Sequence, residues 1–529
     1  MAVLTGCGGD KKETAAAPAE ANTTAAVTEA AKTEAETTAA AQTEAGGEKN
    51  LVMPSASCVA NLNPLLEGYK EAAMLNPIYD PLYVIDVNET RYYLADSYEV
   101  SEDGMQITVK LKEGLKWHDG EAITADDMIF TMDVCSDTNN GAGGTNIVIL
   151  NDQPVKYEKV DDLTVKVTLP MASASYADLL GGLTLIPEHV FEGNPSVVSA
   201  GEANMKGIGS GPYKVTEFKQ DEYLLLEKYE DYYMGAPSID KVTFRIISDL
   251  SAQEVALMNG EVNFMELANA PAVAKYEADP NFTVVKYPEG RVNYLAVNKF
   301  CETVQDPKVV EAVFAALNRD EIIAGAYGDG MAESANSIFS NVNTFYDPSV
   351  EGYTQDVEKA KQLVKETGLD SKTLTLYFNS ERVYMKESAQ IIQQQLKNVG
   401  INLEVIPLES AGFFEKVFGT DGDYEFYLNG YGAVGDPDQV VAGMYDGTWG
   451  VNLAVSDEVS QLWKDARTVY TPEERAAIYK QIQIQTRDEL TCYPIAYPNY
   501  VFVTTSNIKG ADTIKRTPVF EDYTKLTME

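Results

Sequence analysis

Residues 373–405 read TLTLYFNSERVYMKESAQIIQQQLKNVGINLEV, and this stretch decides the fold class. It begins with a strand-like run, TLTLYF, and continues with apolar side chains at helical spacing as far as Val399. Gly400 stands where helices commonly end in a left-handed residue, and apolar and polar residues then alternate from Ile401 to Val405. A strand, a helix and a second strand in this order predict a parallel sheet and an α/β fold.

A second ordered stretch lies much earlier in the chain. Alternating apolar and polar residues at 105–111 predict a half-buried strand, and the Asp-Gly pair at 119–120 predicts a turn. Thr124, followed three positions later by Asp127, is typical of the start of a helix. The predicted order is again strand, turn and helix.

Composition limits both the architecture and the partners. The roughly 480 residues after residue 50 exceed the size at which one hydrophobic core stops growing, so two or more lobes are expected. A net charge of −40 argues against nucleic acid as a partner, because phosphate recognition needs clustered Lys and Arg. The same charge disfavours binding to anionic lipid surfaces. No run of 18 apolar residues predicts a transmembrane helix.

Metal, cofactor and catalytic motifs are not recognisable in the sequence. The cysteines after residue 7 are far apart and form no C-x-x-C pair, and the chain has 2 histidines, so neither a metal site nor a cofactor is expected. GIGSGPY at 207–213 offers glycines for a phosphate loop, but strand-like residues follow it where a helix would be needed. No G-x-S-x-G or H-E-x-x-H motif supports the alternative of a surface hydrolase, so an enzyme is not expected.

The N-terminal segment predicts a tether. Residues 8–50 are almost entirely Ala, Thr, Glu, Gly and Lys, which cannot bury enough apolar surface to become ordered. Leu4-Thr5-Gly6-Cys7 resembles the lipobox of bacterial lipoproteins, in which the cysteine is diacylated. Only six residues precede Cys7, so either the start is a truncated signal peptide or Cys7 is an ordinary cysteine in a disordered terminus.

The sequence resembles one family over most of its length. LADSYEVSEDGMQITVKLKEGLKWHDGEAITADDMIFTMD, residues 94–133, is similar to the most recognisable segment of the family 5 extracellular solute-binding proteins, the oligopeptide, dipeptide and nickel receptors of ABC importers. Further similar segments follow in family order: GSGPYKVTEF (209–218), YEDYYMGAPSIDKVTFRIISD (229–249), ALMNGEVNF (256–264), YLAVNK (294–299), DPKVVEAVFAALNRDEII (306–323), IIQQQLKNVGINLEV (391–405), GYGAVGDPD (430–438) and EERAAIYKQIQ (473–483).

This resemblance implies a two-lobed, periplasmic-binding-protein-like fold of type II. The expected first lobe comprises residues 51–291, with an extra subdomain at about 94–205, and residues 503–529 return to it. The expected second lobe comprises residues 292–502. The strands that cross between the lobes, near Arg291 to Asn293 and near Tyr497 to Phe502, would form a hinge. Such a receptor closes on a solute that contacts both lobes.

GYGAVGDPD is the segment in which the family's peptide receptors hold the ligand's amino group with an aspartate. Here the order is Tyr431, Gly432, Ala433 and Val434, so a valine occupies the position of the anchor carboxylate. The loop is also one residue shorter before Asp436, which is the candidate replacement. Because an apolar side chain cannot pair with an ammonium, a peptide with a free amine is less expected than the family alone suggests.

The resemblance implies further ligand-binding residues elsewhere. Glu67 and Tyr69 lie where family members contact the ligand main chain, and Tyr497 matches an aromatic residue near the second crossing strand. Trp449 and Asn452 lie on a loop that often reaches the cleft. For each of these aromatic residues a purely structural place is an equal alternative.

The predicted function is capture of a small solute, foremost a peptide or peptide-like molecule, and its delivery to an ABC permease and ATPase complex. Oligosaccharides, modified peptides, cationic small molecules and metal chelates stay open as ligands. A sensor or adhesion lipoprotein without a transporter stays open as well, because it would need the same cleft. The expected protein is a monomer outside the cytoplasm, anchored to the membrane through Cys7.

Overall fold

The computed structural model describes residues 48–66, 74–85, 89–150, 152–432, 435–446, 453–514 and 522–529. Residues Glu48–Glu529 form one compact unit. Residues 1–47 of the predicted tether, with Cys7, lie outside the described residues. The predicted end of the tether at residue 50 is wrong, because Asn50 already pairs with Lys241 in a strand. We call residues 51–291 with 503–529 the first lobe and residues 292–502 the second lobe, as in the predicted division.

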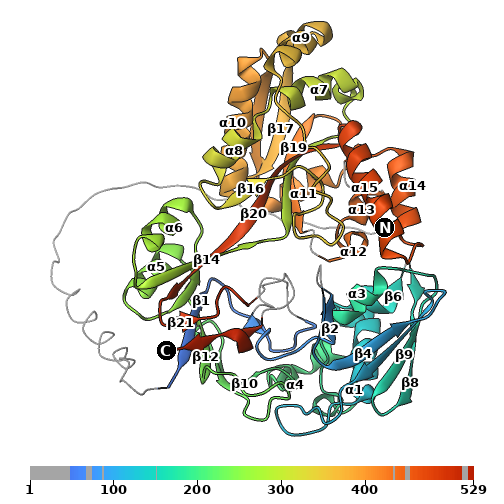
Figure 1. The fold of residues 1–529 in the computed structure, drawn as a ribbon, viewed down its shortest axis with the longest axis vertical. Helices are drawn as coiled ribbons and strands as arrows, with labels where there is room; N and C mark the ends of the chain where they lie inside the picture. The colour runs from blue at the N-terminus through green and yellow to red at the C-terminus, as the bar shows by residue number, and fades with distance from the viewer. Residues whose placement is uncertain are drawn as a thin grey trace, which may run out of the picture. The chain divides into compact units, whose positions relative to one another are not determined.

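The first lobe contains two four-stranded sheets (Figure 1). The strand order in one sheet is β1 (Asn50–Ser55), β12 (Lys241–Ile246), β11 (Tyr223–Lys228) and β10 (Tyr213–Lys219). Strands β1 and β12 are parallel, and the other neighbouring strands are antiparallel. The other sheet is antiparallel throughout, in the order β4 (Ala95–Val100), β5 (Gln106–Leu111), β9 (Thr164–Thr168) and β8 (Lys156–Asp161).

The predicted strand, turn and helix of residues 105–136 are confirmed in the second of these sheets. Strand β5 is followed by α1 (Ala125–Ser136), and Thr124 and Asp127 form the complete capping box. The glycines near residue 209 serve chain packing, since a Cβ on Gly209 would lie 2.0 Å from the carbonyl oxygen of Ile78. Strand β10 follows them, which agrees with the rejection of a phosphate loop.

The second lobe is built on a mixed sheet of eight strands, two of which come from the first lobe. The main path is β13 (Phe264–Glu266), β20 (Cys492–Thr505), β15 (Arg291–Val297), β19 (Phe426–Gly432), β17 (Thr373–Asn379) and β18 (Asn402–Leu408), while β14 (Phe282–Pro288) and β16 (Ala332–Ser334) pair with β20. Strand β17 runs parallel to both β18 and β19, and α10 (Val383–Asn398) connects β17 to β18. The parallel strand-helix-strand unit predicted from residues 373–405 is therefore confirmed.

The remaining elements are short strands and helices. The paired short strands are β2 (Tyr83–Ile85), β3 (Thr90–Tyr92), β6 (Ile149–Leu150), β7 (Gln153–Pro154), β21 (Ile508–Lys509) and β22 (Thr527–Met528). The first lobe also contains α2 (Thr145–Val148), α3 (Tyr176–Gly181), α4 (Gly201–Asn204), α5 (Leu250–Met258) and α6 (Ala270–Glu277). The second lobe adds α7 (Pro307–Ala316), α8 (Arg319–Ala326), α9 (Val357–Thr367), α11 (Ser410–Val417), α12 (Pro437–Val440), α13 (Ala442–Tyr445), α14 (Asp457–Ala466) and α15 (Pro472–Asp488).

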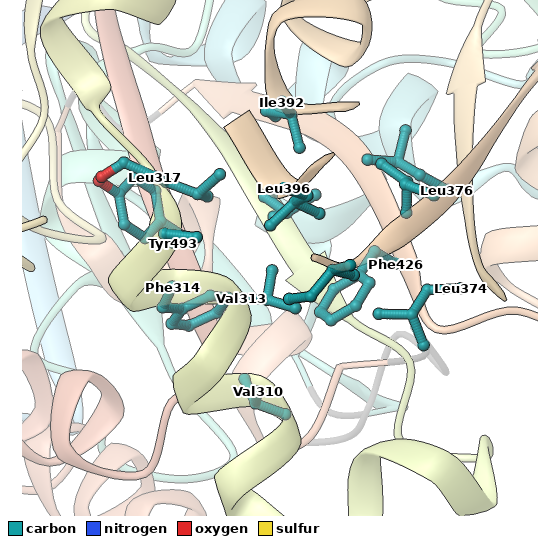
Figure 2. Packing of buried hydrophobic residues seen from close by; sticks show 14 of the residues in the cluster. Val310, Val313, Phe314, Leu317, Leu374, Leu376, Ile392, Leu396, Phe426 and Tyr493 are labelled. Atoms are coloured by element: carbon teal, nitrogen blue, oxygen red, sulfur yellow. The ribbon is translucent and has the colours of Figure 1, made fainter. Parts of the chain in front are cut away.

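Alternate residues of the second-lobe strands pack into two different cores. In β15, Leu295 and Val297 join the core under α7 to α10, whereas Tyr294 and Ala296 join the core on the face covered by α11 and α13 to α15. Figure 2 shows the first of these cores, which includes Phe314 of α7 and Phe426 of β19. Both faces of the sheet are covered, as expected for parallel strands with near-continuous apolar sequence.

Strand β20 belongs to both lobes. Its first part pairs with β15 and β16, and from Asn499 onward it pairs with β14 (Figure 1). The predicted crossing near Tyr497 to Phe502 therefore coincides with the point where β20 changes its partners. Strand β15 starts at Arg291, the first residue of the other predicted crossing strand. A hinge at these two strands stays a prediction.

Candidate functional site

A groove of about 830 Å³ lies beside the point where β20 changes partners. Both lobes contribute to its wall. The first lobe supplies Ser55–Ser57, Asn76, Glu266–Pro271, Glu289 and Arg291, and the second supplies Asn293, Gly325–Gly328, Met331, Arg382–Tyr384, Glu387 and Pro498–Tyr500. A solute in this groove would contact segments of both lobes, as a ligand that drives closure must.

The groove contains charges of both signs. Arg291 donates from Nη2 to the carbonyl oxygen of Gly430 at 2.6 Å and from Nε to Asn293 Oδ1 at 3.0 Å. The guanidinium of Arg382 and the carboxylate of Glu387, both at the start of α10, have no hydrogen-bond or ion-pair partner within the described ranges. These two groups are therefore free to bind the charged groups of a ligand.

A smaller cavity of about 180 Å³, which we call the side pocket, adjoins the groove. Its lining includes Arg291 and Arg382, which also line the groove. The other described lining residues are mostly apolar or neutral: Asn379, Met385, Phe413, Phe414, Phe418, Asn429, Gly430, Tyr431 and Met444. The side pocket lies at the carboxyl ends of β17 and β19, where open α/β sheets commonly bind ligands.

Two predicted ligand residues, Tyr431 and Gly432, end strand β19. Tyr431 is buried, and its hydroxyl donates to the carbonyl oxygen of Ile338 at 2.6 Å and lies 3.1 Å from the hydroxyl of Tyr445. Tyr431 borders the side pocket, so it is close to ligand space although its hydroxyl is used internally. Gly432 is exposed and pairs with Arg291 across the strands.

The candidate replacement carboxylate, Asp436, is already paired. Its Oδ2 and Oδ1 accept from Arg475 at 2.5 and 3.0 Å, and the hydroxyl of Tyr479 lies 3.3 Å from Oδ1. Asp436 and Arg475 are both buried, with 7% and 6% of their surface exposed. A ligand ammonium would have to displace this guanidinium, which would leave a buried positive charge without its partner.

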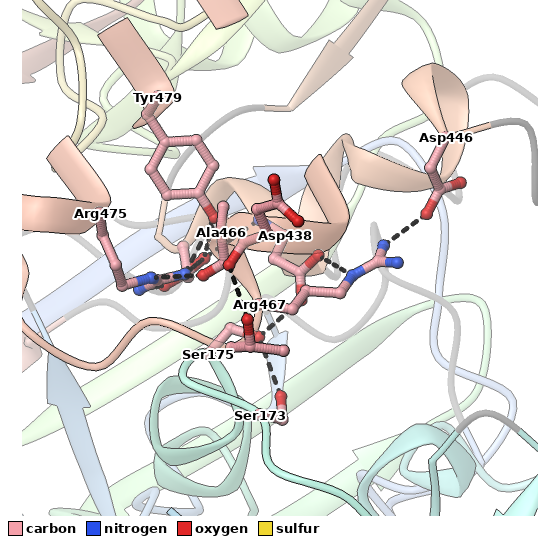
Figure 3. A network of polar contacts seen from close by, with 11 residues as sticks. Ser173, Ser175, Asp438, Asp446, Ala466, Arg467, Arg475 and Tyr479 are labelled. Carbon is pink, nitrogen blue, oxygen red and sulfur yellow. Dashed lines mark hydrogen bonds and ion pairs between the residues drawn. The ribbon is translucent and has the colours of Figure 1, made fainter. Parts of the chain in front are cut away.

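The segment around Asp436 also contacts the first lobe. We call this region the interlobe contact; it comprises Ser175 and Asp178 of the first lobe and Asp436, Asp438, Arg467 and Arg475 of the second. The backbone N–H of Asp436 donates to Asp178 Oδ2 in α3 at 2.9 Å, and Ser175 Oγ donates to Asp438 Oδ2 at 2.9 Å. Arg467 binds Asp438 and Asp446 at 2.5 Å each (Figure 3). Burial raises the pKa of Asp178 to about 6 and also raises the pKa of Asp438.

Tyr497 lies in the core and outside the lining of the groove. Its hydroxyl accepts from the backbone N–H of Ser337 at 3.0 Å and donates to Asn336 Oδ1 at 3.0 Å. The three residues after it, Pro498–Tyr500, line the groove. The structure thus places Tyr497 beside the ligand space and gives its hydroxyl a partner inside the protein.

The other predicted site residues, Glu67, Tyr69, Ala433, Val434, Trp449 and Asn452, lie outside the described residues, as does the lipidation candidate Cys7. Sequence reasoning missed Arg291, Arg382 and Glu387. A signal for Arg382 was available, because it follows the end of a predicted parallel strand and precedes a predicted helix.

Several expectations about composition can be compared with the structure. Within the described residues, no disulfide bond involves Cys58, Cys135, Cys301 or Cys492. Among the residues described, no group of three His, Cys, Asp or Glu side chains could hold a metal ion. Within the same ranges, no helix is long and apolar enough to cross a membrane.

Comparisons with known proteins agree on one family. Residues 89–452 match the family described as bacterial extracellular solute-binding proteins, family 5. The chain is 27% identical to the dipeptide-binding protein of Escherichia coli over 499 residues, covering 87% of this chain and 92% of that one. The structure also resembles the crystal structure of a putative peptide-binding protein AppA from Clostridium difficile, with a TM-score of 0.84. The two sequences are 34% identical, and the match covers 91% of this chain and 100% of that one. A substrate-binding protein of an ABC transporter, CtaP from Listeria monocytogenes, is 33% identical, with a TM-score of 0.84, over 91% of this chain and 99% of that one.

Proposed function

Because this chain belongs to family 5 of the bacterial extracellular solute-binding proteins, we propose that it captures a peptide or peptide-like solute between its lobes for an ABC importer. The groove of about 830 Å³ carries the proposal, because segments of both lobes line it. Arg382 and Glu387, whose side chains have no partner among the described residues, suit a solute with groups of both charges. The similarity to proteins named for dipeptide and peptide binding supports this solute class.

Native mass spectrometry of the purified full-length chain tests the ligand class directly. We expect a co-purified mass that fits a peptide series and disappears after partial unfolding and refolding. A carbohydrate or metal-complex mass would contradict the peptide proposal.

Small-angle scattering tests closure with the same ligand, and we expect the radius of gyration to fall at saturation. Equal profiles with and without ligand would argue against closure.

The proposal includes delivery to a membrane permease and its ATPase by a monomeric receptor held through a diacylated Cys7. The segment at 8–47 would act as a flexible tether of roughly 32–38 Å, from about 5–6 Å times the square root of the residue number. Expression of Cys7→Ser in cells should release the receptor into the medium. Retention of this variant on the cells, with wild type as control, would rule out the lipid anchor.

Val434 allows a separate test of the amino-group site. Val434→Asp restores a carboxylate at the position where peptide receptors of this family hold the ligand's amine. We expect it to raise affinity for peptides with a free amine relative to N-acetylated peptides, as measured by calorimetry. Unchanged affinities for both kinds of peptide would contradict the assignment of this position.

A further inference from the structure

A third cavity, of about 450 Å³, lies where the second lobe meets helix α3 of the first lobe, and we call it the α3 cavity. Residues of β4, β5 and α3 line one side, and the segment before α12 and the start of α15 contribute from the second lobe. None of its described lining residues lines the groove or the side pocket. Its volume falls within the range of about 300–1,000 Å³ that is usual for small-molecule sites.

Contacts between the lobes form the wall of the α3 cavity. Tyr470 of the second lobe packs against the turn between β4 and β5, because a Cβ on Gly104 would overlap the tyrosine ring. The backbone N–H of Asp436 donates to Asp178 Oδ2 at 2.9 Å. A molecule in this cavity would contact both lobes, so its binding would favour the arrangement of the lobes that creates the cavity.

The interior of the α3 cavity is mainly apolar. Strands β4 and β5 contribute Tyr98, Val100 and Ile107, and the second lobe adds Phe345 and Pro472. Val100 is 43% exposed, although most valines of this protein that lie in strands are covered by neighbours. An apolar group placed here would remove such surface from water, which is favourable. The aromatic rings can also accept a cation over their faces.

The charges that line the α3 cavity are predominantly negative. They comprise the carboxylates of Glu102, Asp178 and Asp436 and one guanidinium, that of Arg475, which is bound to both oxygens of Asp436. Within the described ranges, neither Glu102 nor Asp178 has an ion-pair partner. The surplus of negative charge favours a cationic ligand and disfavours an anionic one.

Asp178 and Tyr470 are the polar groups that could orient such a ligand. Burial raises the pKa of Asp178 to about 6, because its surroundings solvate a carboxylate poorly, and a cation beside it would offset this cost. The hydroxyl of Tyr470 is buried and has no hydrogen-bond partner in the described structure. Buried polar atoms nearly always have a partner, and a ligand in the cavity could supply one.

We propose that the α3 cavity binds a small primary amine that carries an apolar group. The ammonium group binds the carboxylate of Asp178, and the apolar part packs against Tyr98, Val100 and Ile107. The volume of 450 Å³ corresponds to about 15 water molecules at about 30 Å³ each, which is room for a molecule with one or two rings. This inference goes beyond the proposed function and does not depend on it, since the groove and the α3 cavity share no described lining residue.

Calorimetry on the full-length protein at about pH 8, where the Asp178 carboxylate is ionised, tests the inference. The probe is phenethylamine, and three related compounds each change one feature. Phenethyl alcohol lacks the charge, ethylamine lacks the ring, and hydrocinnamate carries the opposite charge. We expect phenethylamine to bind at least about tenfold more tightly than each of the three, because it alone uses both the carboxylate and the apolar wall.

Two variants separate the charge from the apolar wall. Asp178→Asn keeps an acceptor for the Asp436 N–H and removes the charge, so phenethylamine should bind no more tightly than phenethyl alcohol. Val100→Trp fills the cavity from a partly exposed position, so the affinity for phenethylamine should fall at least about tenfold. Its matched control is Val160→Trp, at a 57% exposed position of β8 that lines none of the three cavities, and this variant should bind as wild type does.

A further variant excludes the groove as the place of binding. Glu387→Gln removes a carboxylate that lines the groove, and we expect it to leave the affinity for phenethylamine unchanged. Loss of amine binding in this variant would place the amine in the groove and overturn the inference. Amine binding that is unaffected by both Asp178→Asn and Val100→Trp would also overturn it.

The failure of this inference and the failure of the proposed function are distinguishable. If wild type binds phenethylamine no more tightly than phenethyl alcohol, or does not bind it, the inference is overturned and peptide capture in the groove is untouched. If phenethylamine binds as expected but no peptide co-purifies with the protein, the inference stands and the proposed ligand class is wrong.

Discussion

The interlobe contact and the groove differ in whether their charged side chains are paired with other protein side chains. In the interlobe contact, Arg475 pairs with Asp436 and Arg467 pairs with Asp438. In the groove, Arg382 and Glu387 have no protein partner in the described ranges. Charges paired inside the protein hold a conformation in place, whereas unpaired charges lining a cavity can bind a ligand. The contrast supports a structural role for the first region and the proposed role in ligand recognition for the second.

The largest expected effect comes from breaking the buried pair of the interlobe contact. Arg475→Ala leaves the Asp436 carboxylate buried without its partner, and we expect the free energy of unfolding to fall by about 3–5 kcal/mol. Denaturant unfolding measures this loss. The control is Arg245→Ala, which removes a largely exposed pair with Glu261 and should cost at most about 1 kcal/mol. Equal losses of unfolding free energy in the two variants would contradict the view that the buried pair stabilises the fold more than an exposed one.

The second effect is a pH dependence at the interlobe contact. Burial raises the pKa of Asp178 to about 6 from an ordinary value of 3.8, despite its bond from the Asp436 N–H and the nearby charge of Arg475. The folded state therefore holds this proton more tightly than the unfolded state, and stability falls as the pH rises from about 4 to about 6.

Asp178→Asn should remove this part of the pH dependence. We expect the variant to be about 3 kcal/mol more stable than wild type at pH 7, with the difference vanishing below about pH 4. Unfolding titrations across this range measure the difference, and Asp370→Asn at an exposed position serves as control. A stability difference that does not change with pH would contradict the assignment.

The third effect tests how the groove holds its fixed arginine. A Cβ on Gly430 would overlap Asn293 Oδ1 and lie 2.9 Å from Arg291 Nε. Gly430→Ala should therefore displace Arg291 and Asn293 and lower the free energy of unfolding by about 1–3 kcal/mol. Gly432→Ala is a matched control in the same strand, since a Cβ there meets nothing within 4 Å. Thermal unfolding of both variants measures the difference. If both variants unfold at the same temperature, the close approach at Gly430 does not constrain Arg291.

The smallest effect concerns a tyrosine beside the groove. Tyr497→Phe leaves the backbone N–H of Ser337 without its acceptor, so we expect a loss of about 1–2 kcal/mol. Tyr427→Phe removes a buried hydroxyl that has no partner in the described structure, and it should be neutral or slightly stabilising. Denaturant midpoints compare the two variants. A larger loss for Tyr427→Phe would show that these hydroxyls are wrongly assigned.

Local sequence patterns predicted the frame of the molecule well. The parallel unit at residues 373–405, the capping box at Thr124 and the strands after Gly211 are all present in the structure. Each of these features depends on backbone periodicity or on residues within a few positions of one another. The family resemblance extended this frame to two lobes, which the similarity to solved structures confirms.

The site was predicted only in part. Tyr431 borders the side pocket, but its hydroxyl bonds inside the protein, so its role in ligand binding stays a prediction. Asp436 was a candidate for the ligand's ammonium because of its neighbours in sequence, and nothing in that segment indicates that Arg475, far along the chain, pairs with it. Arg382 was missed although its place between a predicted strand and a predicted helix was a usable signal, because a lone arginine forms no motif of its own.

The sequence by itself determined the fold class, the principal elements and the family. Alternation, helical spacing and capping involve residues that are close in sequence, so they can be recognised without the tertiary structure. Only the tertiary structure decided which charges are paired and which are free. Arg291, Arg382 and Phe414 come from separate segments, and they line one pocket because β15, β17 and β19 lie together in one sheet. Side-chain pairing depends on such distant contacts, so no local pattern could have revealed it.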